Sequence, residues 1–220
     1  MVGWNGAETG GPLAGYRIID LTTMISGPLA TMMLGDQGAD VIKVEAPGAG
    51  DYVRSGGHRS GGLAANFLNN NRNKRSIALD LKKSEGREVL LRLAADADVF
   101  IQNFRPGVVE RLGVGETDIR AAKPDIVYVS LSGFGENGPY AAKPVYDPII
   151  QAASGLASVQ GGSDQKQPRL IRTILPDKLT AVTAAQAVTA ALLARERDGI
   201  GQHVRLSMLD AVMAFLWSSD

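Results

Sequence analysis

Cysteine is absent from this chain of 220 residues, and histidine occurs only twice, as His58 and His203. The first absence excludes disulfide bonds, thiolate metal sites and a cysteine nucleophile, and it fits a reducing compartment. Two histidines are too few for a histidine-rich metal centre, so we expect no metal site. We interpret both histidines as surface or structural residues.

An excess of charge of either sign is also missing, since Lys plus Arg and Asp plus Glu both number 23. This balance disfavours binding to nucleic acid or to a membrane surface through bulk charge, so local groups must hold any anionic ligand. No apolar run is long enough to cross a bilayer, and the first dozen residues lack a basic start followed by an apolar segment. We expect a soluble, cytoplasmic protein without nucleic-acid or membrane partners.

Short apolar runs alternate with helical patterns along most of the chain. With 45% hydrophobic residues the chain can bury a sizeable core, and its length is long for one compact domain but short for two. Near-continuous apolar runs separated by helices indicate an α/β fold with a parallel sheet covered on both faces. We predict strands at residues 16–21, 41–45, 77–81, 98–102, 126–131 and 203–207. We predict helices from Pro28 to about Gly35, from Ser84 as N-cap to Ala95, from Tyr146 to Ala153, after Asp177 to about Arg195, and from Leu209 to Trp217.

The loops that follow the strands are the expected ligand-binding regions, because ligands of a doubly wound sheet collect outside the carboxyl ends of its strands. Four loops are predicted to meet there, at residues 22–27, 46–50, 103–107 and 132–138. Residues 46–75 form a long excursion with little periodicity, of a kind that usually carries function or mobility.

Residues 133–138 contain a literal G-x-G-x-x-G sequence, which in other settings marks a dinucleotide site. Here the sequence follows a late strand, it runs into Pro139 rather than directly into a helix, and the first strand-to-helix turn lacks the pattern. We interpret it as a flexible glycine turn. Residues 161–164, Gly-Gly-Ser-Asp, are predicted to form another turn.

A single carboxylate, Asp177, stands between a short apolar run and a long alanine-rich helical pattern. Pro176 halts the apolar run, and the helix follows directly. The position predicts an aspartate at a helix N-terminus, where exposed amides and the positive end of the helix dipole keep a carboxylate charged. Spacing alone leaves open whether Asp177 is an ordinary helix cap or a functional carboxylate.

A series of short motifs runs through nearly the whole chain from Leu13 onward. It comprises residues 13–21, Ser26-Gly-Pro28, residues 38–45, Pro47-Gly48, Gly50-Asp51, residues 73–77, residues 103–107, Gly133-Phe-Gly135, Tyr146-Asp147, Gln151-Ala152, Gly155, Gly201-Gln202 and residues 208–211. In content and order this series resembles the class III CoA-transferases, the CaiB/BaiF family.

The resemblance implies a Rossmann-like parallel sheet flanked by helices, with the start of a second, smaller domain or return segment. It assigns residues 13–220 to the large domain and leaves residues 1–12 as a flexible N-terminus. Because family members are considerably longer and the last predicted helix is still apolar where the sequence stops, we expect a truncated chain. The family architecture implies an interlocked homodimer in the full-length form.

The activity that the resemblance implies is transfer of coenzyme A between an acyl-CoA thioester and a free carboxylic acid. Coenzyme A is then a substrate, and no tightly bound cofactor is expected. Asp177 matches the family nucleophile, which forms a covalent aspartyl-CoA intermediate. By resemblance, the CoA-binding residues are Lys82 and Arg111 at the phosphates, Leu79, Asn103 and Phe104 along the nucleotide and pantetheine, and the Met24 and Ile25 backbone near the thioester.

Two positions depart from the formyl-CoA transferase branch of that family. Ala46 stands where an arginine precedes the Pro-Gly turn, so one expected nucleotide contact is missing. Ile25 stands where that branch has a glutamine, and a less polar residue there suits an acyl group larger or more apolar than oxalate or formate. Composition alone would describe Lys82 and Arg111 as solvated surface charges.

Two other functions stay open from the sequence. The family also contains racemases of 2-methylacyl-CoA thioesters, whose catalytic histidine would fall at Tyr146, a residue with an unsuitable ordinary pKa. A non-catalytic CoA-binding fragment is the third reading. The sequence does not name the donor or the acceptor acid.

Overall fold

The structure is a computed structural model that describes residues 10–165 and 167–217. Most of the predicted flexible segment 1–12 therefore lies outside the described residues. Residues just after this segment are attached to the end of α1 (Ser26–Asp36), since the Leu13 N–H donates to the carbonyl oxygen of Gln37, the residue that caps this helix, at 2.9 Å.

Six parallel strands form the central sheet, in the order β5-β2-β1-β6-β7-β8. Their bounds are β1 (Arg17–Asp20), β2 (Asp40–Glu45), β5 (Lys74–Ala78), β6 (Val99–Gln102), β7 (Val127–Ser132) and β8 (His203–Ser207). The parallel α/β sheet predicted from the apolar runs is confirmed. The strand order reverses between β1 and β6, and the loops that follow these two strands diverge at that point to leave a crevice.

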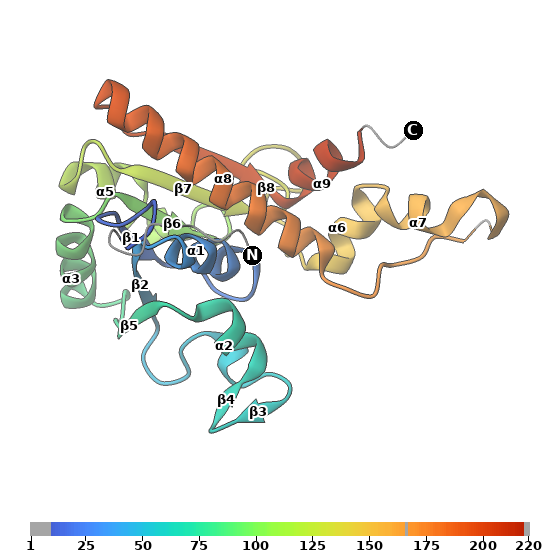
Figure 1. Cartoon of the computed structure of the whole chain (residues 1–220), viewed down its shortest axis with the longest axis horizontal. Coiled ribbons are helices and arrows are strands. Elements are labelled where there is room, and N and C mark those ends of the chain that lie inside the picture. The colour runs from blue at the N-terminus through green and yellow to red at the C-terminus, as the bar shows by residue number, and fades with distance from the viewer. Residues whose placement is uncertain (1–9, 166, 218–220) are drawn as a thin grey trace.

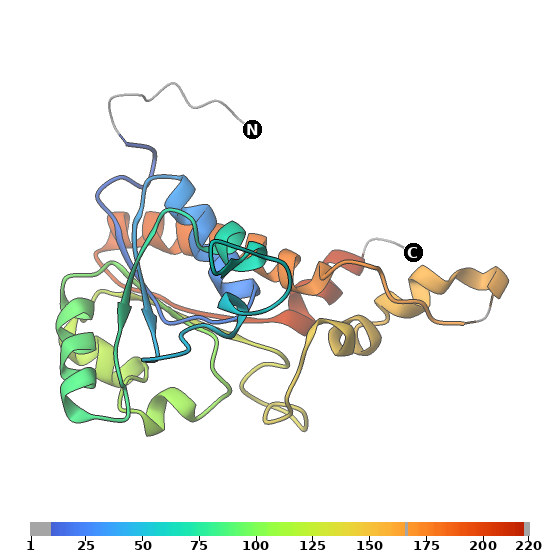
Figure 2. The ribbon, with the colours of Figure 1, turned by 90° about the horizontal axis from the view of Figure 1, so that it is seen from below.

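Alternate side chains of the strands face two different helix layers, as the two-residue period of a strand requires. Ile18 packs in one core cluster and its neighbour Ile19 in the other. One layer is made by α1 (Ser26–Asp36) and α8 (Leu175–Asp198), and the other by α3 (Ser84–Ala95), α4 (Val108–Arg111) and α5 (Glu116–Ala122). Figure 2 shows these layers on opposite sides of the sheet. None of the helices in the described residues is long and apolar enough for a membrane crossing.

The excursion after β2 contains more regular structure than its sequence predicts. It forms a short 3₁₀ turn η1 (Tyr52–Arg54), a two-stranded antiparallel sheet of β3 (Arg59–Ser60) and β4 (Leu63–Ala64), and α2 (Ala65–Asn71). These pieces are too short to show a period, which explains why the sequence missed them. The predicted strand 77–81 also begins earlier, at Lys74, because β5 is an edge strand whose pairing does not depend on an apolar run.

Three helices form a small cluster beyond the carboxyl end of the sheet. They are α6 (Asp147–Ala153), α7 (Leu156–Gln165) and α9 (Met208–Leu216), and they share an apolar core around Ile150 and Val212 with the start of α8. In Figure 1, α6 and α7 extend away from the sheet. The turn predicted at residues 161–164 falls inside α7, where Gly162 breaks the helix with φ 68°.

Two predicted helix caps are wrong by one or more positions. Ser84 is the first residue of α3 rather than its N-cap, and its hydroxyl bonds Glu85 instead of a backbone N–H. Asp177 is the third residue of α8, whose N-cap is Ile174. At the other end of α8 the predicted glycine cap is confirmed, since Gly199 takes the left-handed conformation there.

Candidate active site

Four of the described helices begin around one cavity of about 250 Å³ at the carboxyl end of the sheet. The lining includes the first residues of α1, α6 and α9, which are Ser26, Asp147 and Met208, together with Asp177 in the first turn of α8. Helix N-termini carry unsatisfied N–H groups and partial positive charge. Their convergence favours negative charge inside this cavity.

The ionised form of Asp177 is nevertheless less stable in this cavity than in water. Burial, followed by the nearby Asp147 carboxylate, raises the pKa of Asp177 from 3.8 to about 6, and hydrogen bonding from Ser26 only partly opposes the rise. The sequence predicts that the helix end stabilises the charged carboxylate and keeps it ionised; Asp177 is still mostly ionised at pH 7, but its charge is less stable than that of an ordinary aspartate. Desolvation and a second carboxylate outweigh the helix end, so Asp177 is more basic than an ordinary aspartate.

Asp147 fixes the start of α8 relative to α6. Its Oδ2 accepts a hydrogen bond from the Asp177 backbone N–H at 3.1 Å, and its Oδ1 accepts one from Gln151 Nε2 at 2.7 Å. The Gln151 Oε1 in turn accepts the Ile171 N–H at 2.8 Å, which holds the segment leading into α8. Sequence reasoning assigned Asp147 no role, although a carboxylate beside a proline at a helix start is the same local signal that pointed to Asp177.

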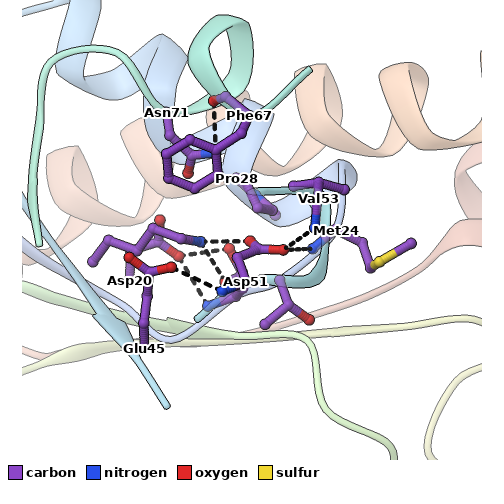
Figure 3. Close-up of polar contacts among 12 residues, drawn as sticks. Asp20, Met24, Pro28, Glu45, Asp51, Val53, Phe67 and Asn71 are labelled. Atoms are coloured by element: carbon purple, nitrogen blue, oxygen red, sulfur yellow. Dashed lines mark hydrogen bonds and ion pairs between the residues drawn. The ribbon is translucent and has the colours of Figure 1, made fainter. Parts of the chain in front are cut away.

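The loop after β1 has a strained backbone where it borders the cavity. Met24, which is not glycine, has φ 69°. Its N–H donates to Asp51 Oδ1 at 3.2 Å, as Figure 3 shows. One residue earlier, Thr23 exchanges two hydrogen bonds with the Asn103 side chain, at 2.9 and 2.8 Å. The loop after β6 and the excursion after β2 therefore both hold this turn in place.

Buried charges lie directly behind that loop (Figure 3). Lys43 Nζ lies 2.9 Å from Asp51 Oδ2 and donates to the Thr22 carbonyl oxygen at 2.8 Å. Lys74 Nζ lies 2.9 Å from Asp20 Oδ2. Burial alone would raise the pKa of Asp20, but Lys74, Lys43 and the Thr22 hydrogen bonds together hold that pKa well below its usual range. The Asp20 carboxylate thus stays charged, and Asp51 orients the backbone at Met24 by accepting its N–H.

Four of the predicted CoA-binding residues share the cavity with Asp177. These are Met24, Ile25, Asn103 and Phe104. The Asn103 side chain is occupied by the Thr23 backbone, so its role in the structure is to connect two loops. The Phe104 N–H donates to Gln102 Oε1 at 2.8 Å, which sets the course of the following residues.

The other three predicted contacts do not line this cavity. Leu79 and Lys82 follow β5, the edge strand, and Lys82 is exposed. Arg111 ends α4, and its guanidinium lies close to Gly107, where an added Cβ would be 3.0 Å from Nη1. All three nevertheless follow carboxyl ends of strands, on the edge of the sheet where the cavity lies. Only an extended ligand could reach both regions.

Sequence reasoning overlooked two cations at the cavity, Arg105 and Lys143. Both are exposed, and Lys143 Nζ lies 4.0 Å from the centre of the Tyr140 ring. Arg105 belongs to a motif that the sequence singled out, whereas Lys143 carried no signal. Tyr146 also lines the cavity, and among the described residues that do so none is a histidine.

Comparison with known proteins identifies the family. The sequence matches the model of CoA-transferase family III over residues 13–219. The acetyl-CoA:oxalate CoA-transferase of Acetobacter aceti is 42% identical over 210 residues, which cover 96% of this chain and 54% of that protein. The succinyl-CoA:glutarate CoA-transferase of Mus musculus is 42% identical over 206 residues, which cover 93% of this chain and 47% of that protein.

A solved structure agrees with these matches. The crystal structure of a CaiB/BaiF family protein from Brucella suis superposes with a TM-score of 0.89 at 37% identity, covering 94% of this chain and 56% of that one. The chain spans about half the length of the curated relatives it matches. Because the family match extends from before the first strand into the last helix, the chain belongs to CoA-transferase family III, the CaiB/BaiF family.

Proposed function

We propose that this chain carries the nucleophile and part of the CoA site of a CoA-transferase that moves coenzyme A between an acyl-CoA thioester and a free carboxylic acid. The observation that carries the proposal is Asp177, a partly buried carboxylate with a pKa raised to about 6 in a cavity where four helix N-termini converge. A carboxylate of this pKa is ionised in its majority at pH 7, and it is more nucleophilic than an ordinary aspartate.

The proposed chemistry proceeds in three exchanges. The Asp177 carboxylate attacks the thioester carbonyl, and the CoA thiolate leaves to give a mixed anhydride. The thiolate then attacks the Asp177 carbonyl, which releases the first acid and leaves an aspartyl-CoA thioester. A second carboxylate reverses both steps and departs as the new acyl-CoA. The backbone N–H groups that begin α1, beside Ser26, are placed to stabilise the oxyanion of each addition.

Coenzyme A is proposed to run from Asp177 along the carboxyl edge of the sheet. Asn103 keeps the loop at Met24 and Ile25 against the thioester, and Phe104 borders the pantetheine. The phosphates need local cations, because the net charge of the chain is zero. Arg105 and Lys143 supply positive charge at the cavity, and Lys82 and Arg111 supply it farther along the edge.

The acyl groups are proposed to be larger than oxalate or formate. Ile25 lines the cavity and presents an apolar side chain there. The exposed Arg105 and Lys143 at the same cavity suit the second carboxylate of a dicarboxylic acid. Succinate and glutarate combine an apolar middle with such a second charge, and one relative is named for this pair.

Mass spectrometry after incubation with succinyl-CoA and trapping with hydroxylamine tests the proposal. We expect a hydroxamate on the peptide that contains Asp177, its loss in Asp177→Asn, and its retention in Asp198→Asn, a change at an exposed aspartate in the same helix. An unmodified Asp177 with several acyl-CoA donors would refute covalent transfer. Because relatives are about twice as long, the test belongs on the full-length protein, whose interlocked homodimer is a further proposal that light scattering checks.

Racemisation of a 2-methylacyl-CoA is less well supported, since Tyr146 occupies the position where the resemblance places the racemase histidine. Racemisation needs no acceptor acid, whereas CoA transfer requires one. Exchange of an α-deuterium into water in the absence of any acceptor acid would indicate the racemase, whereas acceptor-dependent CoA transfer indicates the transferase.

A further inference from the structure

A second cavity, of about 490 Å³, adjoins the one that contains Asp177. The two share the loop after β6, because Phe104, Arg105 and Pro106 line both. The second cavity lies between β7 and β8 on one side and α4 and α5 on the other. Phe104 and Arg105, which are proposed to contact coenzyme A, border this cavity, but Asp177 does not line it.

The register of the sheet places three polar side chains on one face of this cavity. Gln102 of β6 lies opposite Ser130 of β7, and His203 of β8 lies opposite Tyr128 of β7. Ser130 Oγ lies 3.0 Å from His203 Nε2. On the far side of the imidazole, His203 Nδ1 lies 3.2 Å from Oε2 of Glu116, the first residue of α5.

The neighbouring hydrogen bonds define which atom donates and which accepts in each of these contacts. Gln102 Oε1 accepts the Phe104 N–H, which orients the Gln102 amide so that its Nε2 donates to Ser130 Oγ at 3.1 Å. The Ser130 hydroxyl proton is then left to point at His203 Nε2. The imidazole proton resides on Nδ1, toward Glu116. That last contact is within ion-pair distance but does not meet hydrogen-bond geometry, so Nδ1 has no hydrogen-bond partner among the described residues.

We propose that Ser130, His203 and Glu116 form a second acyl-transfer site, in which Ser130 is acylated by small anionic esters or thioesters. A hydroxyl, an imidazole and a carboxylate in this order are the arrangement that activates a serine nucleophile on many unrelated folds. Ser130 is 8% exposed and lines the cavity, so its environment is largely dry but open to a small ligand.

Tyr128 supplies the group that stabilises the oxyanion. Its hydroxyl is buried, lines the same cavity, and has no hydrogen-bond partner in the part of the chain that the structure describes. Burial, followed by the nearby carboxylates of Glu110, Glu116 and Asp118, raises the pKa of Tyr128 well above its usual value, so the hydroxyl remains a donor. An unpaired buried donor is costly, and an oxyanion would satisfy it.

The proposed reaction consumes only the ester or thioester and water. Ser130 Oγ forms a bond to the acyl carbon as the bond to the leaving alkoxide or thiolate breaks. His203 Nε2 takes the Ser130 proton and passes it to the leaving oxygen or sulfur. Water then attacks the acyl-serine, gives its proton to His203, and the same proton returns to Ser130 as the free acid departs.

The substrate class follows from the cavity lining. Phe104, Val109 and Leu131 provide an apolar wall, and Arg105 provides a cation that is exposed and borders both cavities. A short acyl group with a negative charge elsewhere on the molecule fits that combination. Arg205 is already paired with Glu136 at 3.0 Å and contributes less.

Labelling with a fluorophosphonate probe, followed by peptide mass spectrometry on the full-length protein, tests the site. We expect one label on Ser130, its loss in Ser130→Ala, and at least a tenfold slower labelling in His203→Gln. Ser132→Ala is the matched control, because Ser132 lies on the same strand and cavity but its hydroxyl accepts a hydrogen bond from the Gly135 N–H instead. Absence of label, or label that survives Ser130→Ala, would overturn the proposal. Circular dichroism identifies variants that fail to fold.

Glu116 is a positioning residue, and its test is the pH profile of labelling. His203 faces Glu116 on α5, Arg205 on β8, Glu136 in the loop after β7 and the Tyr128 ring. Burial, the larger effect, lowers the pKa of His203, and Glu116 raises it. Glu116→Gln should therefore move the midpoint of labelling to lower pH as well as slow it. An unchanged midpoint with slower labelling would indicate a merely structural carboxylate.

The two sites can be told apart by activity. Ser130→Ala should abolish fluorophosphonate labelling and the hydrolysis of 4-nitrophenyl acetate while leaving CoA transfer in place. If Asp177→Asn abolishes CoA transfer and Ser130 is still labelled, both proposals stand. If Ser130→Ala leaves ester hydrolysis intact, the second site fails independently of the first.

Discussion

At the residue scale, the charged form of Asp177 lowers the stability of the fold. Its N–H donates to Asp147, its partly buried carboxylate lies near that same residue, and its pKa is raised to about 6. An aspartate with a raised pKa is less stable when charged than it would be in water. The fold therefore holds an unusually basic carboxylate at a cost in stability, which packing elsewhere in the molecule must offset.

Asp177→Asn is predicted to stabilise the chain near pH 7.5. The folded chain binds a proton at Asp177 more tightly than the unfolded chain does, so its stability falls as pH rises from about 4 to about 6. Above that window the full penalty is present, and asparagine removes it, for a gain of about 1–3 kcal/mol in the free energy of unfolding.

Urea unfolding at pH 7.5 and at pH 4 measures this difference. The gain should disappear at pH 4, where Asp177 is protonated in the folded chain. The exposed Asp198→Asn should change stability by less than about 1 kcal/mol at both values. A gain of equal size at both pH values would mean that packing rather than charge is responsible.

At the scale of elements, the loop after β1 depends on ion pairs that only the fold assembles. Lys43 on β2 and Asp51 in the excursion are fully buried as a pair, and both bond the loop backbone. Lys74 on β5 plays the corresponding role for Asp20 at the end of β1. Three strands and one loop are thus connected through groups that cannot be separated without leaving a buried charge unpaired.

Lys43→Met is predicted to destabilise the chain by about 3–5 kcal/mol, because the Asp51 carboxylate would stay buried without its partner. Chemical denaturation compares this variant with Arg72→Met, which breaks the exposed pair between Arg72 and Asp36 and should cost about 0–1 kcal/mol. Equal effects of the two substitutions would show that the buried pair does not hold the loop.

At the scale of the whole molecule, the cavity connects two parts of the fold. The sheet, through α1 and the loops after β1 and β6, forms one wall, and the helices beyond the sheet, with the start of α8, form the other. Figure 1 shows how α6 and α7 extend from the sheet past this junction. A ligand in the cavity contacts both parts and so favours one arrangement of them.

Coenzyme A is predicted to stabilise the molecule as a whole and to protect this junction most. At 100 times its Kd it should add about 2.7 kcal/mol to the free energy of unfolding. Hydrogen exchange should slow in the first turns of α6 and α8, whereas α3, on the opposite face of the sheet, should change only through global stability. Equal protection of α3 and α8 by the ligand would argue against binding at the cavity.

The sequence by itself determined the α/β fold, the parallel sheet, most strand positions and the family. These depend on local signals: apolar runs, a proline before a helix, and motifs in a fixed order. The same reasoning predicted four CoA-binding residues that the structure places at one cavity with Asp177, because loops at the carboxyl ends of parallel strands must meet.

Only the tertiary structure decided the chemistry of the individual groups. The raised pKa of Asp177 arises from burial and from Asp147, thirty residues away in the chain, and no local pattern reports either. The Lys43–Asp51 pair, Arg105 and Lys143 at the cavity, and the contacts of Ser130 with His203 depend on distances between separate elements. Charge and reactivity are set by desolvation and by neighbours in space, which the order of residues does not state.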